Sequence, residues 1–327
     1  MHGAGKPSEV LRLDDIDDPV VGPGEVLVQT AATALNFNEV DGCRGRYLTV
    51  NPPIPYTLGM ELTGEVVGGE AEWLGRRVVA TARYAFGAHA ELVACPVAMT
   101  FDAPDALPGS DAAAFLFPFH LAWLGLHERG RLQPGETVLV HAGAGGVGSA
   151  AIQLARAHGC RVLATASGAK GDLCRELGAD VTIDYQRDDF TTAALEATDG
   201  RGVDVVFDGV GLVEPSVACL ARNGRHLLIG FAGDIGAEDQ PGITPRPLLF
   251  GNVSLVGVML AYVDDAVCPR GLTPRSVGQR VHDQLCRLLD EGTIRPVIGA
   301  RVPFAELPQA LDEMEARSTT GRVVVEL

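Results

Sequence analysis

The residues with the clearest chemical signature form a glycine-rich segment that reads HAGAGGVG from His141 to Gly148. Its glycines fit the pattern G-x-G-x-x-G, in which the first glycine permits a tight turn and the second lets the backbone approach a pyrophosphate. The third lets a following helix pack on the preceding strand, and the N-terminus of that helix offers free N–H groups and a partial positive charge to phosphates. We therefore expect cofactor contacts from Gly143, Ala144, Gly145, Gly146, Val147 and Gly148.

The segment after the next expected strand indicates which dinucleotide binds. NAD sites usually carry an Asp or Glu there, which binds the ribose hydroxyls. Here the strand Arg161–Thr165 is followed by the letters ASGAK, and the first carboxylate is Asp172. Ser167 and Lys170 could instead bind a 2′-phosphate, because the absent acid removes a repulsion and the lysine adds a counter-charge. We therefore predict a preference for NADPH, with the alternative that Lys170 is only a solvated lysine at a helix start.

Strands and helices alternate around the glycine segment, beginning near residue 110. β-prone runs end in glycines or turns, and segments with apolar residues at helical spacing follow them. The expected strands are Thr137–His141, Arg161–Thr165, Asp180–Asp184, Val203–Phe207, Arg225–Gly230 and Leu255–Leu260, and the expected helices include Val147–His158 and Lys170–Leu177. This alternation predicts an α/β fold, a Rossmann domain whose doubly wound parallel sheet has helices on both faces.

The flanking segments predict a second, β-rich domain. Before residue 110, short β-prone runs such as Glu25–Gln29 and Val78–Ala82 alternate with Gly and Pro. After the parallel-sheet segment we expect two amphipathic helices and a final strand at His282–Asp290, Leu307–Arg317 and Val323–Leu327. The sequence thus predicts a Rossmann NADP-binding domain at 113–262, inserted in a catalytic domain that is formed by residues 1–112 and 263–327.

The composition excludes several classes of protein. The 327 residues include 26 Lys and Arg against 42 Asp and Glu, a formal net charge of −16. A surface this acidic repels phosphate backbones and anionic lipids, which argues against nucleic acid and membranes as partners. The N-terminus does not look like a signal peptide and no apolar stretch comfortably spans a bilayer, so we expect a soluble cytoplasmic protein. The seven cysteines form no C-x-x-C pair, which disfavours a disulfide framework and structural zinc.

Several motifs, in chain order, are similar to those of one enzyme family. They are PGEVLV at Pro23–Val28, NFNE at Asn36–Glu39, GMELTG at Gly59–Gly64, the run Gln133–Gly148, DGVG at Asp208–Gly211 and STTG at Ser318–Gly321. On these motifs the chain resembles the medium-chain dehydrogenase/reductase superfamily, and most closely its zinc-independent quinone oxidoreductase and enoyl reductase branch. The resemblance covers nearly the whole chain and implies a GroES-like catalytic domain around the Rossmann domain.

The resemblance also implies roles for individual residues. Zinc-dependent members have a Cys where this chain has Asn36 and a His where it has Met60, so the resemblance implies that no metal is bound. It implies that Tyr47 orients substrate or donates a proton, and that Asn36 contacts the nicotinamide ribose and forms hydrogen bonds in the active site. It places 2′-phosphate contacts at Lys170, Tyr185 and Arg317, and nicotinamide contacts at Val210 and Phe231. Tyr47 could instead be bonded to backbone, and Arg317 could be a plain helix-terminal charge.

The expected reaction follows from a hydride donor without a metal. Reducing a simple ketone usually needs a strong electrophile at the oxygen, often zinc. Reducing a double bond conjugated to a carbonyl is easier, because hydrogen-bond donors can stabilise the enolate that forms as hydride adds to the β-carbon. We therefore expect NADPH-dependent reduction of a small-molecule quinone, or of the double bond of an α,β-unsaturated carbonyl or enoyl thioester.

Other functions and the oligomeric state are less closely defined. Some quinone reductases have an active-site Tyr at the position of Asp41, and a Thr often stands at the position of Leu121. A catalytically altered nucleotide-binding protein with a structural or regulatory role therefore stays an alternative. A methyltransferase with a similar glycine loop is disfavoured by the acid-free segment around Lys170. The apolar strand Leu255–Leu260, expected near a sheet edge, predicts a homodimer.

Overall fold

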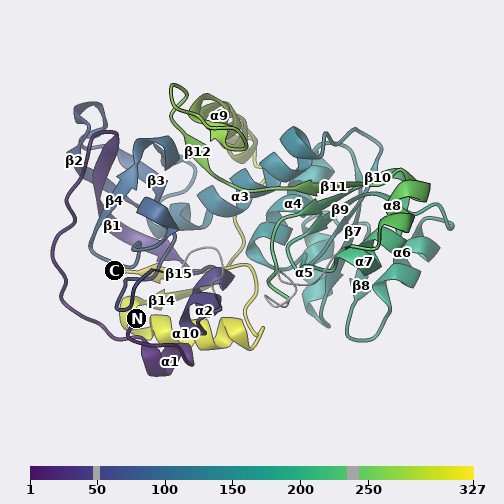
Figure 1. Ribbon diagram of the computed structural model, residues 1–327, viewed down its shortest axis with the longest axis horizontal. Coiled ribbons are helices and arrows are strands. Elements are labelled where there is room, and N and C mark those ends of the chain that lie inside the picture. The colour runs from purple at the N-terminus through teal and green to yellow at the C-terminus, as the bar shows by residue number, and fades with distance from the viewer. Residues whose placement is uncertain (47–51, 234–242) are drawn as a thin grey trace. The chain divides into compact units, whose positions relative to one another are not determined.

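The computed structural model describes residues 1–46, 52–233 and 243–327, and the chain separates into two compact units (Figure 1). Unit 1 comprises Met1–Phe117, Ala261–Asp290 and Pro296–Leu327, so it contains both termini. Unit 2 comprises Pro118–Leu260 and Glu291–Arg295. The chain of unit 2 is therefore inserted in that of unit 1. The functional ranges expected from the sequence, divided at 112 and 262, stay a prediction.

Unit 2 is built on a six-stranded parallel sheet with the strand order β11-β10-β9-β6-β7-β8. Its strands are β6 (Thr137–Val140), β7 (Arg161–Ala166), β8 (Val181–Asp184), β9 (Val203–Asp208), β10 (Leu220–Leu228) and β11 (Ser254–Gly257). Every residue of β6 is buried, as expected of a strand that is covered on both faces. The winding direction reverses between β6 and β9, and open α/β sheets bind ligands at such a point, beyond the carboxyl ends of the strands.

Helices connect the strands of unit 2. They are α4 (Gly146–Ala157), α5 (Lys170–Glu176), α6 (Phe190–Ala197), α7 (Val213–Ala218) and α8 (Pro245–Gly251), while α3 (Leu116–Trp123) and a π-helical segment (Leu124–Arg129) precede β6. The core between sheet and helices includes Leu139, Leu163 and Val206, all fully buried. The predicted α/β parallel sheet is thus confirmed.

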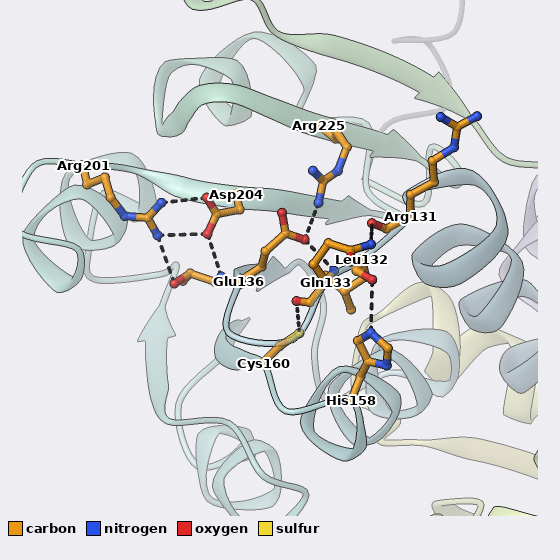
Figure 2. A network of polar contacts seen from close by, with 10 residues as sticks. Arg131, Leu132, Gln133, Glu136, His158, Cys160, Arg201, Asp204 and Arg225 are labelled. Carbon is orange, nitrogen blue, oxygen red and sulfur yellow. Dashed lines mark hydrogen bonds and ion pairs between the residues drawn. The ribbon is translucent and has the colours of Figure 1, made fainter.

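A polar network holds the amino-terminal edge of this sheet (Figure 2). Asp204, near the start of β9, pairs with Arg201 and accepts a hydrogen bond from the Thr137 N–H at 2.8 Å. Glu136, directly before β6, pairs with Arg225 of β10. Burial raises the pKa of Asp204, but the hydrogen bonds from Arg201 and the Thr137 N–H and the charges of Arg201 and Arg225 together outweigh burial, and the pKa is lowered. The polar side chains at this edge are therefore occupied with one another.

Unit 1 is built on a seven-stranded sheet in which β1 pairs with three partners. The order is β14-β15-β1-β2-β3-β5, and β4 also pairs with β1. The strands are β1 (Glu25–Ala34), β2 (Glu61–Gly69), β3 (Arg77–Thr81), β4 (Leu92–Pro96), β5 (Thr100–Asp102), β14 (Ile298–Pro303) and β15 (Arg322–Glu326). Strand β1 is long enough to pair with β4 along its first half and with β15 near its end. The β-rich domain predicted from the flanking segments is confirmed.

Short elements complete unit 1. Its helices are α1 (Pro7–Val10), α2 (Phe37–Cys43), α9 (Arg275–Asp290) and α10 (Leu307–Glu315), and β12 (Tyr262–Val263) pairs with β13 (Thr273–Pro274). Single 3-10 turns lie at Ala71–Trp73, Arg83–Ala85, Val97–Met99, Gly109–Ala114 and Phe304–Glu306. In the parts of the chain that the structure describes, no helix combines the length and the apolar character needed to cross a membrane.

Candidate functional site

The glycine segment forms the turn between β6 and α4. The Gly143 N–H donates to the carbonyl oxygen of Thr165 at 2.9 Å, which ties the turn to the neighbouring strand β7. The Gly145 N–H donates to the Ala142 oxygen at 2.9 Å, and Gly145 is the N-cap of α4. Because a glycine N-cap has no side chain to accept the first N–H groups of the helix, these groups are left for an anion.

Two of the glycines are required by close packing. A Cβ on Gly148 would lie 2.2 Å from the Ala142 oxygen, and a Cβ on Gly143 would lie 2.9 Å from the Ala164 Cβ. Gly145 has more room, with 3.2 Å to the same Ala142 oxygen. The turn therefore has the tight geometry that a pyrophosphate-binding turn needs, and its residues fit a dinucleotide.

The residues predicted to bind a 2′-phosphate lie at the carboxyl ends of two adjacent strands. Ser167 follows β7, and its carbonyl oxygen accepts a hydrogen bond from the N–H of Lys170, the first residue of α5, at 3.0 Å. Tyr185 follows β8 and is 45% exposed. In the parallel register Ala166 stands opposite Asp184, so both chains leave the sheet at the same edge. The structure thus brings Ser167, Lys170 and Tyr185 together at the edge that the glycine turn also occupies.

A second turn at this edge follows β9. Asp208 ends the strand fully buried, and its Oδ1 accepts hydrogen bonds from the Val210 N–H at 2.7 Å and the Gly211 N–H at 2.9 Å. Gly211 has a φ of +94°, and a Cβ on it would lie 3.0 Å from the Phe231 ring. Val210 and Phe231, both predicted near the nicotinamide, therefore belong to two turns that pack against each other. The DGVG motif was visible in the sequence, but the role of its aspartate was not.

Buried histidines lie beneath both turns. His141 hydrogen bonds through Nδ1 to Thr165 Oγ1 at 3.2 Å and through Nε2 to Ser216 Oγ at 3.0 Å. Burial lowers the pKa of His141 to about 4, so the ring is neutral at pH 7. His226 of β10 donates from Nε2 to Asp208 Oδ2 at 3.1 Å. Burial raises the pKa of Asp208, but the hydrogen bonds from His226 and the Val210 N–H, together with the two nearby histidines, outweigh burial, and the pKa is lowered.

In unit 1, Asn36 is buried in a polar cluster. Its Nδ2 donates to the Ala34 oxygen at 3.1 Å and to Glu61 Oε1 at 3.2 Å, and its Oδ1 accepts from Arg322 Nη1 at 3.0 Å. Arg322 also forms a buried ion pair with Glu61. Burial raises the pKa of Glu61, and the Arg322 charge opposes that rise. Arg322 was not predicted from the sequence. It lies directly after the STTG motif, but no local pattern distinguishes it from an ordinary surface arginine.

This cluster does not fit a catalytic zinc ion. Zinc sites in proteins are built from thiolate, imidazole and carboxylate ligands. Here the three positions are held by the Asn36 amide, the Met60 thioether and the Glu61 carboxylate, which already pairs with a guanidinium. Across residues 1–46, 52–233 and 243–327, no group of three or more His, Cys, Asp and Glu side chains could hold a metal ion.

A second buried acid–base pair lies in unit 1. His89 bonds through Nε2 to Glu39 Oε2 at 3.1 Å and through Nδ1 to Thr33 Oγ1 at 2.8 Å, and all three side chains are buried. Asp41, on the same helix as Glu39, pairs with Arg46 at 3.0 Å. In the sequence, Asp41 stood out only as a departure from the family pattern, and Glu39 only as the end of the NFNE motif.

Tyr47 and Arg317 complete the set of predicted site residues. Tyr47 lies outside the described residues. Arg317 follows α10 in unit 1 with a φ of +57°, and its guanidinium carbon lies 5.9 Å from the centre of the Phe37 ring. Their contacts with cofactor or substrate stay predictions.

Comparison with known proteins defines the family. The alcohol dehydrogenase GroES-like domain matches residues 22–105, and the zinc-binding dehydrogenase domain matches residues 146–270. The quinone oxidoreductase of Pseudomonas aeruginosa is 35% identical, over 97% of this chain and 95% of its own length. The synaptic vesicle membrane protein VAT-1 homolog of Rattus norvegicus is 33% identical, over 94% of this chain and 78% of its own length.

A solved structure agrees with these matches. The quinone oxidoreductase from Thermus thermophilus, whose complex with NADPH is also known, is 34% identical with a TM-score of 0.78, and the match covers 97% of this chain and 96% of that chain. The chain therefore belongs to the medium-chain dehydrogenase/reductase superfamily, a family of two-domain oxidoreductases, as its motifs predict. Within this superfamily it is similar to the quinone oxidoreductases.

Proposed function

We propose that the protein is an NADPH-dependent oxidoreductase that transfers hydride to a quinone, or to the double bond of an α,β-unsaturated carbonyl or enoyl thioester. The observation that carries this proposal is the segment that follows β7, where residues 167–171 contain no carboxylate. At this edge of the unit 2 sheet the glycine turn, Ser167, Lys170 and Tyr185 leave the strands side by side. The similarity to a quinone oxidoreductase solved with NADPH supports the same assignment.

Different residues of unit 2 bind different parts of the cofactor. Free N–H groups in the first turn of α4 bind the pyrophosphate, since the helix N-terminus carries a partial positive charge. Lys170, with Ser167 and Tyr185, binds the 2′-phosphate through charge-assisted hydrogen bonds. Val210 and Phe231 flank the nicotinamide. When bound, NADPH supplies the hydride.

The substrate side is assigned to residues of unit 1. Tyr47 is our proposed proton donor, directly or through water, and Asn36 is our proposed hydrogen-bonding residue of the active site. Glu61 and Arg322 hold the Asn36 amide in one orientation. Since the Asn36, Met60 and Glu61 set does not suit zinc, we propose that the reaction needs no metal. Stoichiometric zinc in the purified protein, with activity lost on chelation, would refute this part.

The direct test is NADPH oxidation with a panel of quinones and enones, with every product identified. Saturated ketones from enones would establish double-bond reduction, and hydroquinones formed without semiquinone radicals would establish two-electron quinone reduction. If NADPH binds and neither these compounds nor carrier-linked enoyl thioesters are reduced, the proposed reaction is wrong. The alternative is then favoured, a nucleotide-binding protein with a structural or regulatory role.

We further propose that the protein is a homodimer. Strand β11 is an edge strand of the unit 2 sheet, and its backbone can pair with another strand. Large apolar side chains are exposed in the same unit, with Leu249 72%, Phe250 71% and Met259 60% exposed. Light scattering at micromolar concentration should give twice the chain mass of 34.3 kDa. A monomer mass would contradict the proposal.

A further inference from the structure

The turn after β9 is held by one buried carboxylate. Both oxygens of Asp208 are engaged: Oδ1 accepts from the Val210 and Gly211 N–H groups at 2.7 and 2.9 Å, and Oδ2 accepts from His226 Nε2 at 3.1 Å. Asp208 and His226 are both fully inaccessible to solvent. Hydrogen bonds to an ionised acceptor are stronger than neutral ones, and a low-dielectric interior strengthens them further. Asp208 therefore ties the turn to the sheet, in addition to the backbone hydrogen bonds that Ala232 and Gly233 donate to the Gly209 and Val210 oxygens at 3.0 Å.

His226 gives this carboxylate its orientation. The ring belongs to β10, the strand next to β9, and its Nδ1 has no hydrogen-bond partner among the described residues. A buried polar atom without a partner costs free energy, and the charge-assisted hydrogen bond to Asp208 is the ring's compensating contact. Its one hydrogen bond is to Asp208. The pair thus connects β10, through Asp208, to the backbone of the turn.

The turn leaves little room for adjustment. Gly211 has a φ of +94° and packs against Phe231. A Cβ on Gly233 would lie 2.5 Å from Val210 Cγ1, and the Gly233 N–H donates to the Val210 oxygen at 3.0 Å. A shift of Val210 would therefore also move the segment that carries Phe231. Both residues are the proposed neighbours of the nicotinamide.

We propose that Asp208, oriented by His226, is a positioning residue for hydride transfer: it fixes the Val210–Gly211 turn and thereby the place of the nicotinamide. This inference rests on the proposed function. On this proposal two groups of residues have different roles at the carboxyl edge of the sheet. The glycine turn and Lys170 determine the affinity for NADPH, and Asp208 determines how the nicotinamide is aligned with the substrate. Misplacement of reacting groups by about 1 Å can cost about 100-fold in rate, so alignment should show in kcat more than in affinity.

The test uses four variants of the full chain. Asp208→Ala removes the acceptor, and Asp208→Asn keeps an oxygen for the two N–H groups. His226→Gln keeps a donor toward the carboxylate. Asp204→Asn is the matched control, because Asp204 lies on the same strand, accepts a backbone N–H at 2.8 Å and pairs with Arg201 at the opposite edge (Figure 2).

We expect D208A to lower kcat by about 100-fold while the dissociation constant for NADPH changes little. D208N and H226Q should each lower kcat less than D208A does. D204N should lower the melting temperature and leave kcat unchanged. The nicotinamide fluorescence of bound NADPH should change in D208A and not in D204N. Hydrogen exchange at the Val210 and Gly211 amides should accelerate in D208A, while the glycine turn stays protected.

The proposal is overturned if D208A, assayed well below its melting temperature, keeps the kcat of the wild type or keeps protection at Val210 and Gly211. It is also overturned if D204N and D208A lose kcat equally, since the effect would then follow stability. The experiment distinguishes failure of this proposal from failure of the proposed function. A wild-type protein that reduces no acceptor refutes the reaction, whereas fluorescence of bound NADPH and hydrogen exchange still test the turn.

Discussion

At the scale of single residues, the buried ion pair between Arg322 and Glu61 bears on both stability and chemistry. The pair lies in unit 1 with Asn36 bonded to both members. Removing one partner of a buried pair leaves an uncompensated charge, which usually costs more than the pair itself contributes. The pair also gives the Asn36 amide a single orientation, which a hydrogen-bonding residue of an active site requires.

The variant Arg322→Met should therefore destabilise the protein by about 3–5 kcal/mol, because it leaves the Glu61 carboxylate buried without its cation. The double variant R322M/E61Q should recover much of this loss. Arg44→Met is the control, since the Arg44–Glu315 pair is partly exposed and such pairs contribute about 1 kcal/mol or less. Urea unfolding at pH 7 measures all three. An R322M protein within about 1 kcal/mol of the wild type, on the order of the exposed pair, would contradict this assignment.

Residues of the candidate site differ in how well the sequence could predict them. The glycine turn and Lys170 could be predicted because their chemistry is local: the motif, the preceding strand and the following helix are consecutive in the chain. The partnership of Asn36 with Arg322 spans 286 residues and depends on β15 lying beside β1. Such a contact exists only in the folded chain, so no local pattern could indicate it.

At the scale of elements, the glycines of the turn between β6 and α4 have two different roles: one permits close packing, and the other leaves room for the cofactor. Gly148 is needed for folding, because a Cβ there would lie 2.2 Å from the Ala142 oxygen. Folding does not require Gly145, since its φ is −83° and a Cβ there, 3.2 Å from the same oxygen, needs only a small shift. The same Cβ would lie at the end of the helix where the pyrophosphate is expected.

We predict that G145A folds with nearly wild-type stability but binds NADPH about tenfold more weakly, the effect of roughly 1.4 kcal/mol. G148A should instead lower the melting temperature by several degrees, as expected of overpacking that costs about 1–3 kcal/mol. Differential scanning calorimetry and a binding titration separate the two effects. Equal losses of stability in both variants would contradict this prediction, because Gly145 would then be as necessary for folding as Gly148.

Where the hydrophobic periodicity is strong, the ends of helices and strands agree with those predicted from the sequence. Strand β7 and helices α4 and α5 lie within two residues of their predicted ends. Strand β10 begins at Leu220 instead of Arg225, because Leu220 already pairs with Val203 before a register shift. Helix α9 begins at Arg275 instead of His282, since its first two turns carry few apolar residues. Tertiary pairing extends elements beyond what local pattern predicts.

At the scale of the whole molecule, three histidines make stability depend on pH: His141 and His282, which are buried, and His127, which is partly buried. Burial lowers the pKa of His127, His141 and His282 to about 4, whereas an unfolded chain titrates histidine near 6.5. Below pH 6.5 the unfolded state therefore binds protons that the folded state does not, and the free energy of unfolding falls until about pH 4. Above pH 6.5 the stabilisation is fully present.

The expected slope near pH 5 is about 4 kcal/mol per pH unit, from three protons at about 1.4 kcal/mol each. Denaturant unfolding between pH 7 and 5 measures it. His127→Phe removes one of the three groups and should reduce the slope by about a third. A free energy of unfolding that stays constant over this range would contradict the burial of these rings in their neutral form.

The proposed cofactor specificity is tested most directly by kcat/KM with NADPH and with NADH, on whichever acceptor the panel shows to be reduced. This specificity predicts a clear preference for NADPH. It also predicts that Lys170→Ala lowers kcat/KM for NADPH by about 10- to 100-fold, as for a lost charged hydrogen bond, and leaves that for NADH unchanged. Lys6→Ala, at the other lysine of the chain, should change neither. Equal kcat/KM with both cofactors in the wild type, or no effect of K170A, would contradict it.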